Sequence, residues 1–155
     1  FRPYEATVGR RMGRAVPSAL LYSQPVRFLR LRSFVIDVSK VDDVNDLYLA
    51  SDVLLTDYSS VMFDYANLRR PIVLFVPDRE RYADAIRGFY FDLEEVPGPL
   101  CSTTDEVVEE LTHVEGHRTK YEQAYAAFVE KFCPLDDGCA CARVLERLAS
   151  FVALP

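Results

Sequence analysis

Four small polar residues in a short turn are the residues of this sequence best suited to bind a phosphate group. They lie between an apolar run at residues 53–55 and a helical pattern that begins at Val61, and they are Thr56, Asp57, Ser59 and Ser60. Such residues are favoured in turns and at helix N-caps. Free backbone N–H groups and the helix dipole attract anions at a helix start, and serines add hydroxyl donors. The pattern therefore predicts a phosphate cradle, although a plain capped helix start uses the same residue types.

A strand before this turn and a helix after it must hold the four side chains in place. The apolar run at 53–55 is typical of a buried strand. Apolar residues then recur at helical spacing from Val61 to Leu68, and Pro71 ends the segment before a second apolar run at 72–76. The order strand, turn, helix, strand predicts one βαβ unit. Ligands of open α/β sheets bind at the carboxyl ends of such strands, which is where this turn lies.

Arg87 and Gly88 form a second candidate site further along the chain. They precede the aromatic residues 89–91. A glycine beside an arginine lets the guanidinium approach a phosphate closely and form paired, charge-assisted hydrogen bonds. A surface ion pair with one of the many nearby acidic residues explains the same arginine equally well. The residues alone leave both interpretations open.

Motifs in four places carry a resemblance to a known family. The first runs through the turn, with Asn-Asp-Leu-Tyr-Leu at 45–49 and Thr-Asp-Tyr-Ser-Ser-Val-Met-Phe-Asp-Tyr at 56–65. The others are Arg-Gly-Phe-Tyr-Phe-Asp at 87–92, Pro-Gly-Pro at 97–99 and Leu-Asp-Asp-Gly at 135–138. In this order, and covering roughly residues 34–148, they resemble the CDP-glycerol glycerophosphotransferase family of teichoic-acid polymerases.

The resemblance implies a function and a partial architecture. Family members resemble GT-B glycosyltransferases, in which two Rossmann-like domains enclose the active site and the C-terminal domain holds the nucleotide. This chain looks like that C-terminal, CDP-glycerol-binding domain. The implied reaction, part of cell-wall biogenesis, transfers glycerol phosphate from CDP-glycerol to a growing teichoic-acid chain and releases CMP. The general base is expected on the other domain or on a partner chain, so this chain alone is expected to be inactive.

The resemblance also assigns roles to particular residues. The substrate-binding set that it implies consists of Thr56, Asp57, Ser59, Ser60, Arg87 and Gly88. Arg87 becomes a pyrophosphate or substrate contact, and no metal or cofactor is implied beyond the donor itself. Related enzymes have a His-Pro pair near the place where this chain has Ser23-Gln24-Pro25. Gln24 either replaces that histidine or belongs to a divergent start with no correspondence. Full-length members are expected in the cytoplasm, peripheral on the inner face of the plasma membrane.

The predicted fold class is α/β, a Rossmann-like doubly wound parallel sheet with a helical C-terminal tail. Strands are expected at 34–38, 53–55 and 72–76, with a short helix capped by Asp42 or Asp43 before the second. Thr103 with Glu106 matches a capping box, and helices are expected at about 117–131 and 139–152. Their apolar stripes are interpreted as core-facing. The predicted division is a divergent basic segment at 1–33 and the nucleotide-binding domain at 34–155.

Bulk properties exclude several classes of protein. The net charge of −6 argues against a nucleic-acid binder, although residues 1–33 contain seven arginines and one glutamate. No apolar run approaches the length of a membrane span, and no signal peptide is visible. The four cysteines lack the paired spacing of a structural zinc site and are expected to be free thiols. His113 and His117 are interpreted as exposed helix residues.

Three other interpretations compete with the leading one. A related GT-B domain could bind a different nucleotide sugar, and a non-catalytic remnant could fold without binding a nucleotide. The acidic residues Asp42, Asp43 and Asp57 also suit a receiver domain, but that fold needs a lysine at a later strand end, and Lys120 and Lys131 fall in helical segments. The motifs are compatible with glycerol or ribitol as donor and with a polymerase or a primase.

Overall fold

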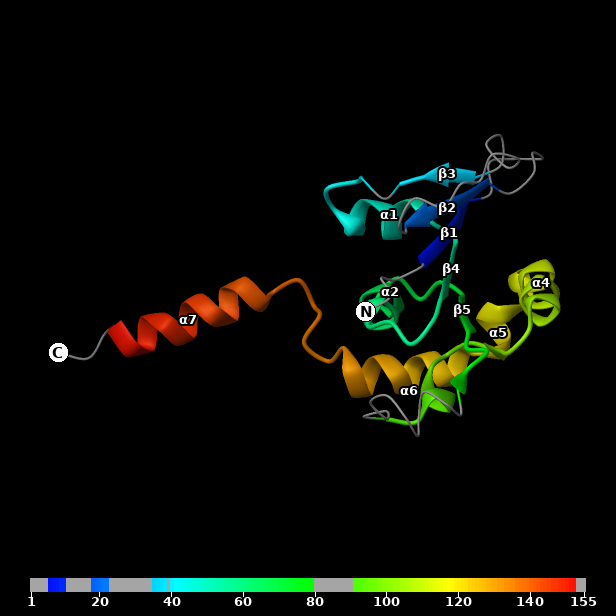
Figure 1. Ribbon diagram of the computed structural model, residues 1–155. Helices are drawn as coiled ribbons and strands as arrows, with labels where there is room; N and C mark the ends of the chain where they lie inside the picture. The colour runs from blue at the N-terminus through cyan, green and yellow to red at the C-terminus, as the bar shows by residue number, and fades with distance from the viewer. Residues whose placement is uncertain (1–5, 11–17, 23–34, 39, 80–90, 153–155) are drawn as a thin grey trace.

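A mixed six-stranded sheet forms the centre of the molecule. The computed structural model describes residues 6–10, 18–22, 35–38, 40–79 and 91–152. The sheet has the order β3-β2-β1-β4-β5-β6 (Figure 1). Its strands are β1 (Ala6–Arg10), β2 (Ser18–Tyr22), β3 (Val35–Asp37), β4 (Val53–Thr56), β5 (Ile72–Phe75) and β6 (Leu100–Cys101). The α/β class and the three strands expected from the sequence are confirmed.

Five of the six strands run in the same direction, and β1 runs against its neighbours. β4, β5 and β6 are parallel, as are β2 and β3, whereas β1 is antiparallel to both β2 and β4. Only residues 11–17 separate β1 from β2. A parallel pair needs a crossover of about a dozen residues or more, so this short connection requires an antiparallel pair. The predicted boundary at residue 33 stays a prediction. β1 and β2, which precede it, pair within this sheet.

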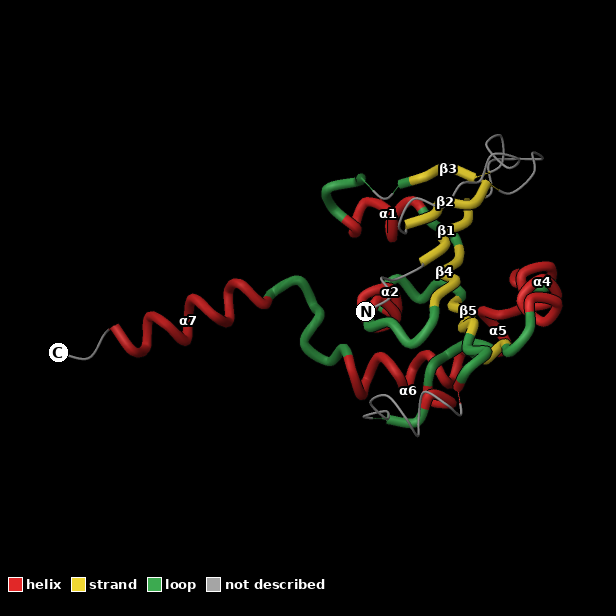
Figure 2. Tube along the Cα trace, in the orientation of Figure 1, coloured by secondary structure: helices red, strands yellow, loops and turns green. Residues whose placement is uncertain are grey.

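The helices cover both faces of the sheet. They are α1 (Val44–Ala50), α2 (Val61–Ala66), α4 (Thr104–Thr112), α5 (His117–Lys120), α6 (Glu122–Phe132) and α7 (Ala140–Val152), with short 3-10 turns η1 (Leu93–Glu95) and η2 (Val114–Gly116). Figure 2 shows α2 and α4 on opposite sides of β4 and β5. The alternating direction of side chains along β5 explains this arrangement. Ile72 and Leu74 pack in the core with residues of α2 and α6, whereas Val73 points to the other face and packs with Cys101 and with Val107 of α4.

Two of the expected helix starts have the predicted chemistry. Asp43 caps α1, because its carboxylate accepts the backbone N–H of Asn45 at 2.8 Å. Thr103 and Glu106 form the capping box of α4. The Thr103 hydroxyl accepts the Glu106 backbone N–H, and the Glu106 carboxylate accepts the Thr103 backbone N–H. The helix expected at 117–131 is instead two helices, because Tyr121 (φ −109°, ψ 13°) leaves helical geometry between α5 and α6.

Gly98 fixes the distance between β5 and the loop before β6. A Cβ at this position would overlap the carbonyl oxygen of Ile72. The close approach allows the Leu74 N–H to donate to the Pro99 carbonyl at 2.9 Å and the Val76 N–H to donate to the Cys101 carbonyl at 2.8 Å. The stiff Pro-Gly-Pro loop at 97–99 therefore seats β6 against β5.

The apolar stripes of two helices are not core-facing as predicted. In α4 only Val107 is buried, whereas Val108 and Leu111 are exposed. In α7 the whole stripe is more than half exposed, at Val144, Leu145, Leu148 and Phe151. Figure 1 shows α7 projecting away from the sheet and its covering helices. Within the described chain nothing covers this stripe, which is why periodicity alone gave the wrong burial. None of the described helices is both long enough and apolar enough to cross a bilayer.

Candidate functional site

The predicted phosphate cradle lies at the carboxyl edge of the sheet. Thr56 is the last residue of β4, the turn follows at 57–60, and α2 begins at Val61. β4 and β5 are parallel neighbours in which Thr56 pairs with Leu74, so the turn lies beside the loop that follows β5. The structure thus brings together Thr56, Asp57, Ser59 and Ser60, the four described members of the predicted set. Arg87, Gly88 and Gln24 lie outside the described residues.

The two serines of the cradle have different environments. The side chain of Ser59 is completely buried, and its hydroxyl accepts the backbone N–H of Val61 at 3.2 Å. Ser60 is exposed, and within the described chain its hydroxyl makes no capping hydrogen bond to α2. Ser59 therefore holds the turn, and Ser60 presents a hydroxyl to solvent at the edge of the sheet.

The first amides of α2 are used within the turn. The Val61 N–H donates to the Ser59 hydroxyl, the Met62 N–H to the Ser59 carbonyl at 3.3 Å and the Phe63 N–H to the Ser60 carbonyl at 3.0 Å. α2 has only six residues, and the dipole of so short a helix is small. Side-chain hydroxyls are consequently better placed than helix amides to bind an anion here.

Thr56 carries a buried hydroxyl without a partner. Its side chain is 2% exposed, and no described residue forms a hydrogen bond with its Oγ1 atom. A buried hydroxyl left without a hydrogen bond costs about 1–3 kcal/mol, so a ligand oxygen or water that reached it would be stabilised. The neighbouring Asp57 is half-buried in the turn. The edge therefore combines one buried and one exposed hydroxyl, from Thr56 and Ser60.

A network of hydrogen bonds beside β4 joins α1, α2 and α6. The Tyr65 hydroxyl donates to the Ser51 carbonyl at 3.2 Å and accepts from the Ser51 hydroxyl at 3.3 Å. Arg70 donates to the carbonyls of Tyr48 and Leu49 at the end of α1, at 3.3 and 2.9 Å. The Tyr125 hydroxyl donates to the Arg70 carbonyl. Burial raises the pKa of both Tyr65 and Tyr125, so both phenols stay neutral donors.

The motif at 135–138 lies at the other end of α2. Asn67, which caps the carboxyl end of α2, donates to the Asp136 carboxylate at 3.0 Å. Burial, and then the charge of Asp136, raise the pKa of Asp64. The hydrogen bond from Arg143, followed by that from the Cys139 N–H, lowers the pKa of Asp137. This motif packs against α2 and stands apart from the cradle.

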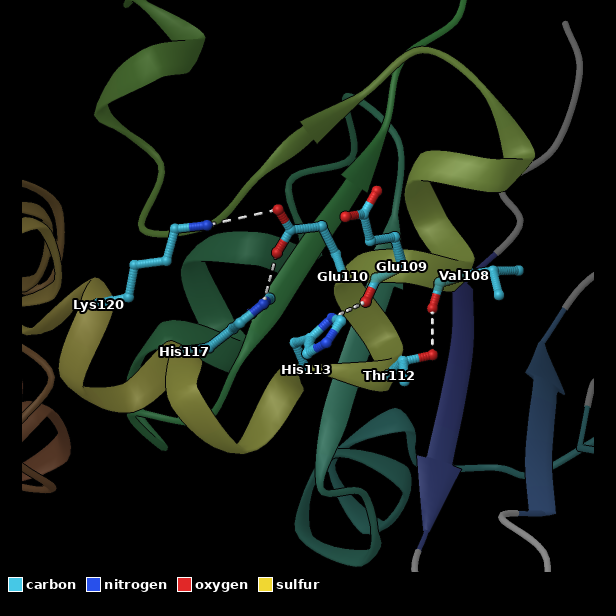
Figure 3. Close-up of polar contacts among 7 residues, drawn as sticks. All are labelled: Val108, Glu109, Glu110, Thr112, His113, His117 and Lys120. Carbon is cyan, nitrogen blue, oxygen red and sulfur yellow. Dashed lines mark hydrogen bonds and ion pairs between the residues drawn. The ribbon is translucent and has the colours of Figure 1, made fainter.

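His117 was wrongly predicted to be exposed. It is 3% exposed, and its Nε2 atom lies 2.7 Å from a Glu110 carboxylate oxygen. The other oxygen of Glu110 accepts from Lys120 at 3.4 Å, so the carboxylate lies between the two side chains (Figure 3). These residues belong to α4 and α5, on the face of the sheet away from α2. The helical periodicity of this segment contained no signal of the burial.

The four cysteines all lie within the described part of the chain. Cys101 and Cys133 are buried, Cys139 and Cys141 are exposed, and all four thiols are free. Among the residues that the structure describes, no group of three or more histidine, cysteine, aspartate or glutamate side chains could hold a metal ion.

Comparisons with known proteins identify the family to which this chain is similar. Residues 20–150 match the profile of the family described as CDP-glycerol:poly(glycerophosphate) glycerophosphotransferase. The teichoic acid poly(glycerol phosphate) polymerase of Bacillus subtilis is 49% identical over 106 residues, which cover 68% of this chain and 14% of that protein. Its counterpart in Bacillus spizizenii is 42% identical over 129 residues, which cover 83% of this chain and 32% of that protein.

A solved structure extends the similarity to the fold. The wall teichoic acid polymerase TagF superposes with a TM-score of 0.75 and 34% identity, over 86% of this chain and 34% of that one. A variant of TagF soaked with CDPG gives the same values. The chain therefore spans between 14% and 34% of the length of these proteins.

Proposed function

Because this chain belongs to the CDP-glycerol:poly(glycerophosphate) glycerophosphotransferase family, we propose that it is the part of such an enzyme that binds CDP-glycerol. The observation that carries the proposal is the pair of hydroxyls at the carboxyl edge of β4. Thr56 offers a buried hydroxyl without a partner in the described chain, and Ser60 offers an exposed one. Both suit the oxygens of a pyrophosphate, since hydrogen bonds to charged groups are stronger than neutral ones.

The proposed reaction moves one phosphoryl group. The acceptor hydroxyl oxygen at the end of a teichoic-acid chain bonds to the glycerol-bearing phosphorus, and the bond from that phosphorus to the bridging oxygen breaks. CMP leaves with the electron pair, and the acceptor proton passes to a general base. That base is expected outside this chain, on the remaining part of the enzyme or on a partner chain.

The residues of this chain act on the phosphate charge. Thr56 and Ser60 hold and polarise the pyrophosphate by hydrogen bonds, while Ser59 maintains the turn that presents them. Arg87 supplies a positive charge to the leaving phosphate, with Gly88 permitting close approach. Such fixed donors lower the barrier by stabilising charge where it develops. The catalytic residues proper belong to the missing part of the enzyme, so the isolated chain should bind donor without turnover.

The remaining features of the proposal concern donor, acceptor and location. Glycerol phosphate is the preferred donor group, because the relatives with the highest identities are named for poly(glycerol phosphate). The proposed acceptor is a growing teichoic-acid chain, which suits relatives that are named as teichoic acid polymerases. The full-length enzyme is proposed to work at the inner face of the plasma membrane, held there by the part outside this chain or by a partner.

Calorimetric titration of the chain with CDP-glycerol tests the proposal. Ser60→Ala should weaken binding by about tenfold or more, because a hydrogen bond to a charged group is worth roughly 1.5–3 kcal/mol. Arg87→Ala should weaken it too, more at low salt than at high salt. Arg118→Ala, on α5, is the matched charge control and should bind as the unchanged chain does.

Each competing interpretation has its own outcome. Tighter binding of UDP-sugars than of CDP-glycerol would identify a different GT-B donor domain, and tighter binding of CDP-ribitol would change the donor group. A folded chain that binds no cytidine nucleotide would be a non-catalytic remnant. Release of CMP coupled to polymer growth by the chain alone would contradict the assignment of the base to another part.

A further inference from the structure

The middle residue of the cradle connects two loops of the sheet. Tyr58 lies between Asp57 and Ser59, and its hydroxyl donates to the Asp78 carboxylate at 2.9 Å. The two residues are 20 positions apart in the chain. Tyr58 belongs to the turn after β4, and Asp78 to the turn after β5. The contact therefore joins the carboxyl ends of two adjacent parallel strands.

We propose that Tyr58 and Asp78 are a pair of positioning residues that fix the cradle in its donor-binding orientation. This proposal rests on the donor site proposed above and deepens it. Tyr58 lies between Thr56 and Ser60 in the chain, so the hydrogen bond from its phenol to Asp78 restrains the backbone that connects the two hydroxyls. The pair is called the Tyr58–Asp78 clasp below.

The surroundings of the cradle explain why a clasp is needed. α2 is fewer than two turns long, and in the turn before it the Ser59 hydroxyl accepts the Val61 N–H. Ser60 is exposed, so packing does not set its position. A hydrogen bond from Tyr58 to the neighbouring loop restricts the turn from outside, which lowers the entropy lost when a ligand binds.

The other side of the clasp is itself anchored. The Val76 N–H donates to the Cys101 carbonyl at 2.8 Å, and Val76 is buried. The Arg79 N–H donates to the Val76 carbonyl, and the Arg79 guanidinium pairs with Glu94 at 3.2 Å. Asp78 therefore projects from a loop tied to β6 and η1, and it offers Tyr58 a fixed acceptor.

The clasp also gives the Asp78 carboxylate a partner at an edge that binds anions. A free carboxylate beside the cradle would repel a pyrophosphate, since like charges at close range oppose each other. The phenol hydroxyl gives one carboxylate oxygen a donor and holds it on the β5 side. The chemistry of the pair is positioning alone, because neither residue is assigned a contact with the reacting atoms.

Three variants test the clasp. Tyr58→Phe removes the donor, Asp78→Ala removes the acceptor, and Asp78→Asn keeps an oxygen acceptor without the charge. Tyr58→Phe and Asp78→Ala should each weaken CDP-glycerol binding by about two- to tenfold, the range of one hydrogen bond. Asp78→Asn should lose less than either. The double variant Tyr58→Phe/Asp78→Ala should be no weaker than the single variants, because both remove the same interaction.

Two further readouts separate positioning from a general structural role. Affinity for cytidine, which has no phosphate, should stay the same in all variants, as should the melting temperature. Hydrogen exchange of the amides at 57–61 in the ligand-free chain should accelerate in Tyr58→Phe and in Asp78→Ala alike. Tighter CDP-glycerol binding by Asp78→Ala, additive losses in the double variant, or unchanged exchange would each overturn the clasp.

The outcomes distinguish this proposal from the one on which it rests. If the unchanged chain binds no CDP-glycerol, the donor site is wrong, and the exchange measurement still decides whether the clasp fixes the turn. If the unchanged chain binds CDP-glycerol and Tyr58→Phe binds it equally well, the donor site stands and the positioning role is refuted.

Discussion

Two amphipathic helices of this molecule have opposite surroundings. α2 has six residues, and three of them, Met62, Tyr65 and Ala66, are buried against β4, β5 and α6. α7 has thirteen residues and an apolar stripe at helical spacing, yet the stripe is exposed. The longer helix with the clearer pattern is thus the one without a core. An apolar stripe predicts that a helix will have a partner, and says nothing about which part of the protein supplies it.

The supports of the two helices differ in kind. α2 is held by burial in the sheet core, which scales with apolar area removed from water. α7 is held at its start by one cluster of polar contacts, in which Arg143 pairs with Asp137 at 2.7 Å and donates to the Leu135 carbonyl at 2.6 Å. Helices as short as α7 are marginal in water without tertiary packing. Almost all of the free energy of unfolding of this chain should therefore come from the sheet and the helices that pack on it.

A matched pair of leucines gives the largest expected contrast. Leu54→Ala in β4, where the side chain is fully buried, should lower the free energy of unfolding by about 2–5 kcal/mol. Leu148→Ala in α7, where the side chain is exposed, should change it by less than about 0.5 kcal/mol. Urea unfolding followed by tyrosine fluorescence measures both. Equal losses would mean that α7 packs on the body in solution and would break the comparison.

Two glycines extend the contrast to the backbone. Gly98→Ala should cost about 1–3 kcal/mol or more, because the new methyl group overlaps the Ile72 carbonyl and separates β6 from β5. Gly116→Ala is the control, since nothing lies near its added Cβ, and it should be neutral. Thermal melting of the two variants gives the answer. A Gly98→Ala chain with unchanged melting would show that the Pro-Gly-Pro loop does not seat β6.

The two serines of the cradle separate stability from binding. Ser59→Ala removes the acceptor of the Val61 N–H and should cost about 1 kcal/mol of stability, as the loss of a helix cap does. Ser60→Ala should leave the melting temperature unchanged and weaken CDP-glycerol binding. Melting and titration of each single variant, and not of the double variant alone, make the distinction. If Ser59→Ala weakened binding and Ser60→Ala lowered the melting temperature, the roles of the two residues would be exchanged.

The reactivity of the thiols gives the smallest of the expected differences between the core and the α7 region. Burial, followed by the charges of Glu110 and Glu106, raises the pKa of Cys101 to about 11. The stability that this buried, protonated thiol contributes is complete below its ordinary pKa of 9.0 and is lost as the pH rises through about 11. At pH 8 an alkylating reagent should modify Cys139 and Cys141 and leave Cys101 and Cys133 unmodified. Mass spectrometry of the alkylated chain counts the modified thiols, and early labelling of Cys101 would contradict its burial.

Local chemistry was the part of the structure that the sequence predicted well. The strands β4 and β5, the cap at Asp43 and the capping box of Thr103 and Glu106 follow from residue type and spacing within a few positions. The position of the polar turn between β4 and α2 was also predicted, whereas its role as a phosphate cradle stays a prediction. These features depend on neighbours in the chain, which is the information that a single sequence contains.

Features that depend on distant residues were not predictable in the same way. The insertion of β1 between β2 and β4 depends on its pairing with a strand more than 40 positions later in the chain, and the Nε2 atom of the buried His117 meets the Glu110 carboxylate from α4. The difference between Ser59 and Ser60 depends on the rotation of one turn. The exposure of the α7 stripe depends on the absence of a packing partner among the described residues. For β1 and His117 the deciding contact joins segments that no local periodicity connects.

The place of β1 in the sheet has a consequence for the order in which the chain acquires its shape. β1 lies between β2 and β4, and its register joins Val8 to Leu54. As the polypeptide leaves the ribosome, β1 can pair with β2 as soon as Tyr22 has emerged, but its second edge stays open until β4, which begins at Val53, has been synthesised. Such an open edge is a template for pairing with other nascent chains. Pairing of β4 with β1 closes this edge. Because the phosphate-binding turn directly follows β4, the same step that removes the exposed edge also positions the proposed ligand site.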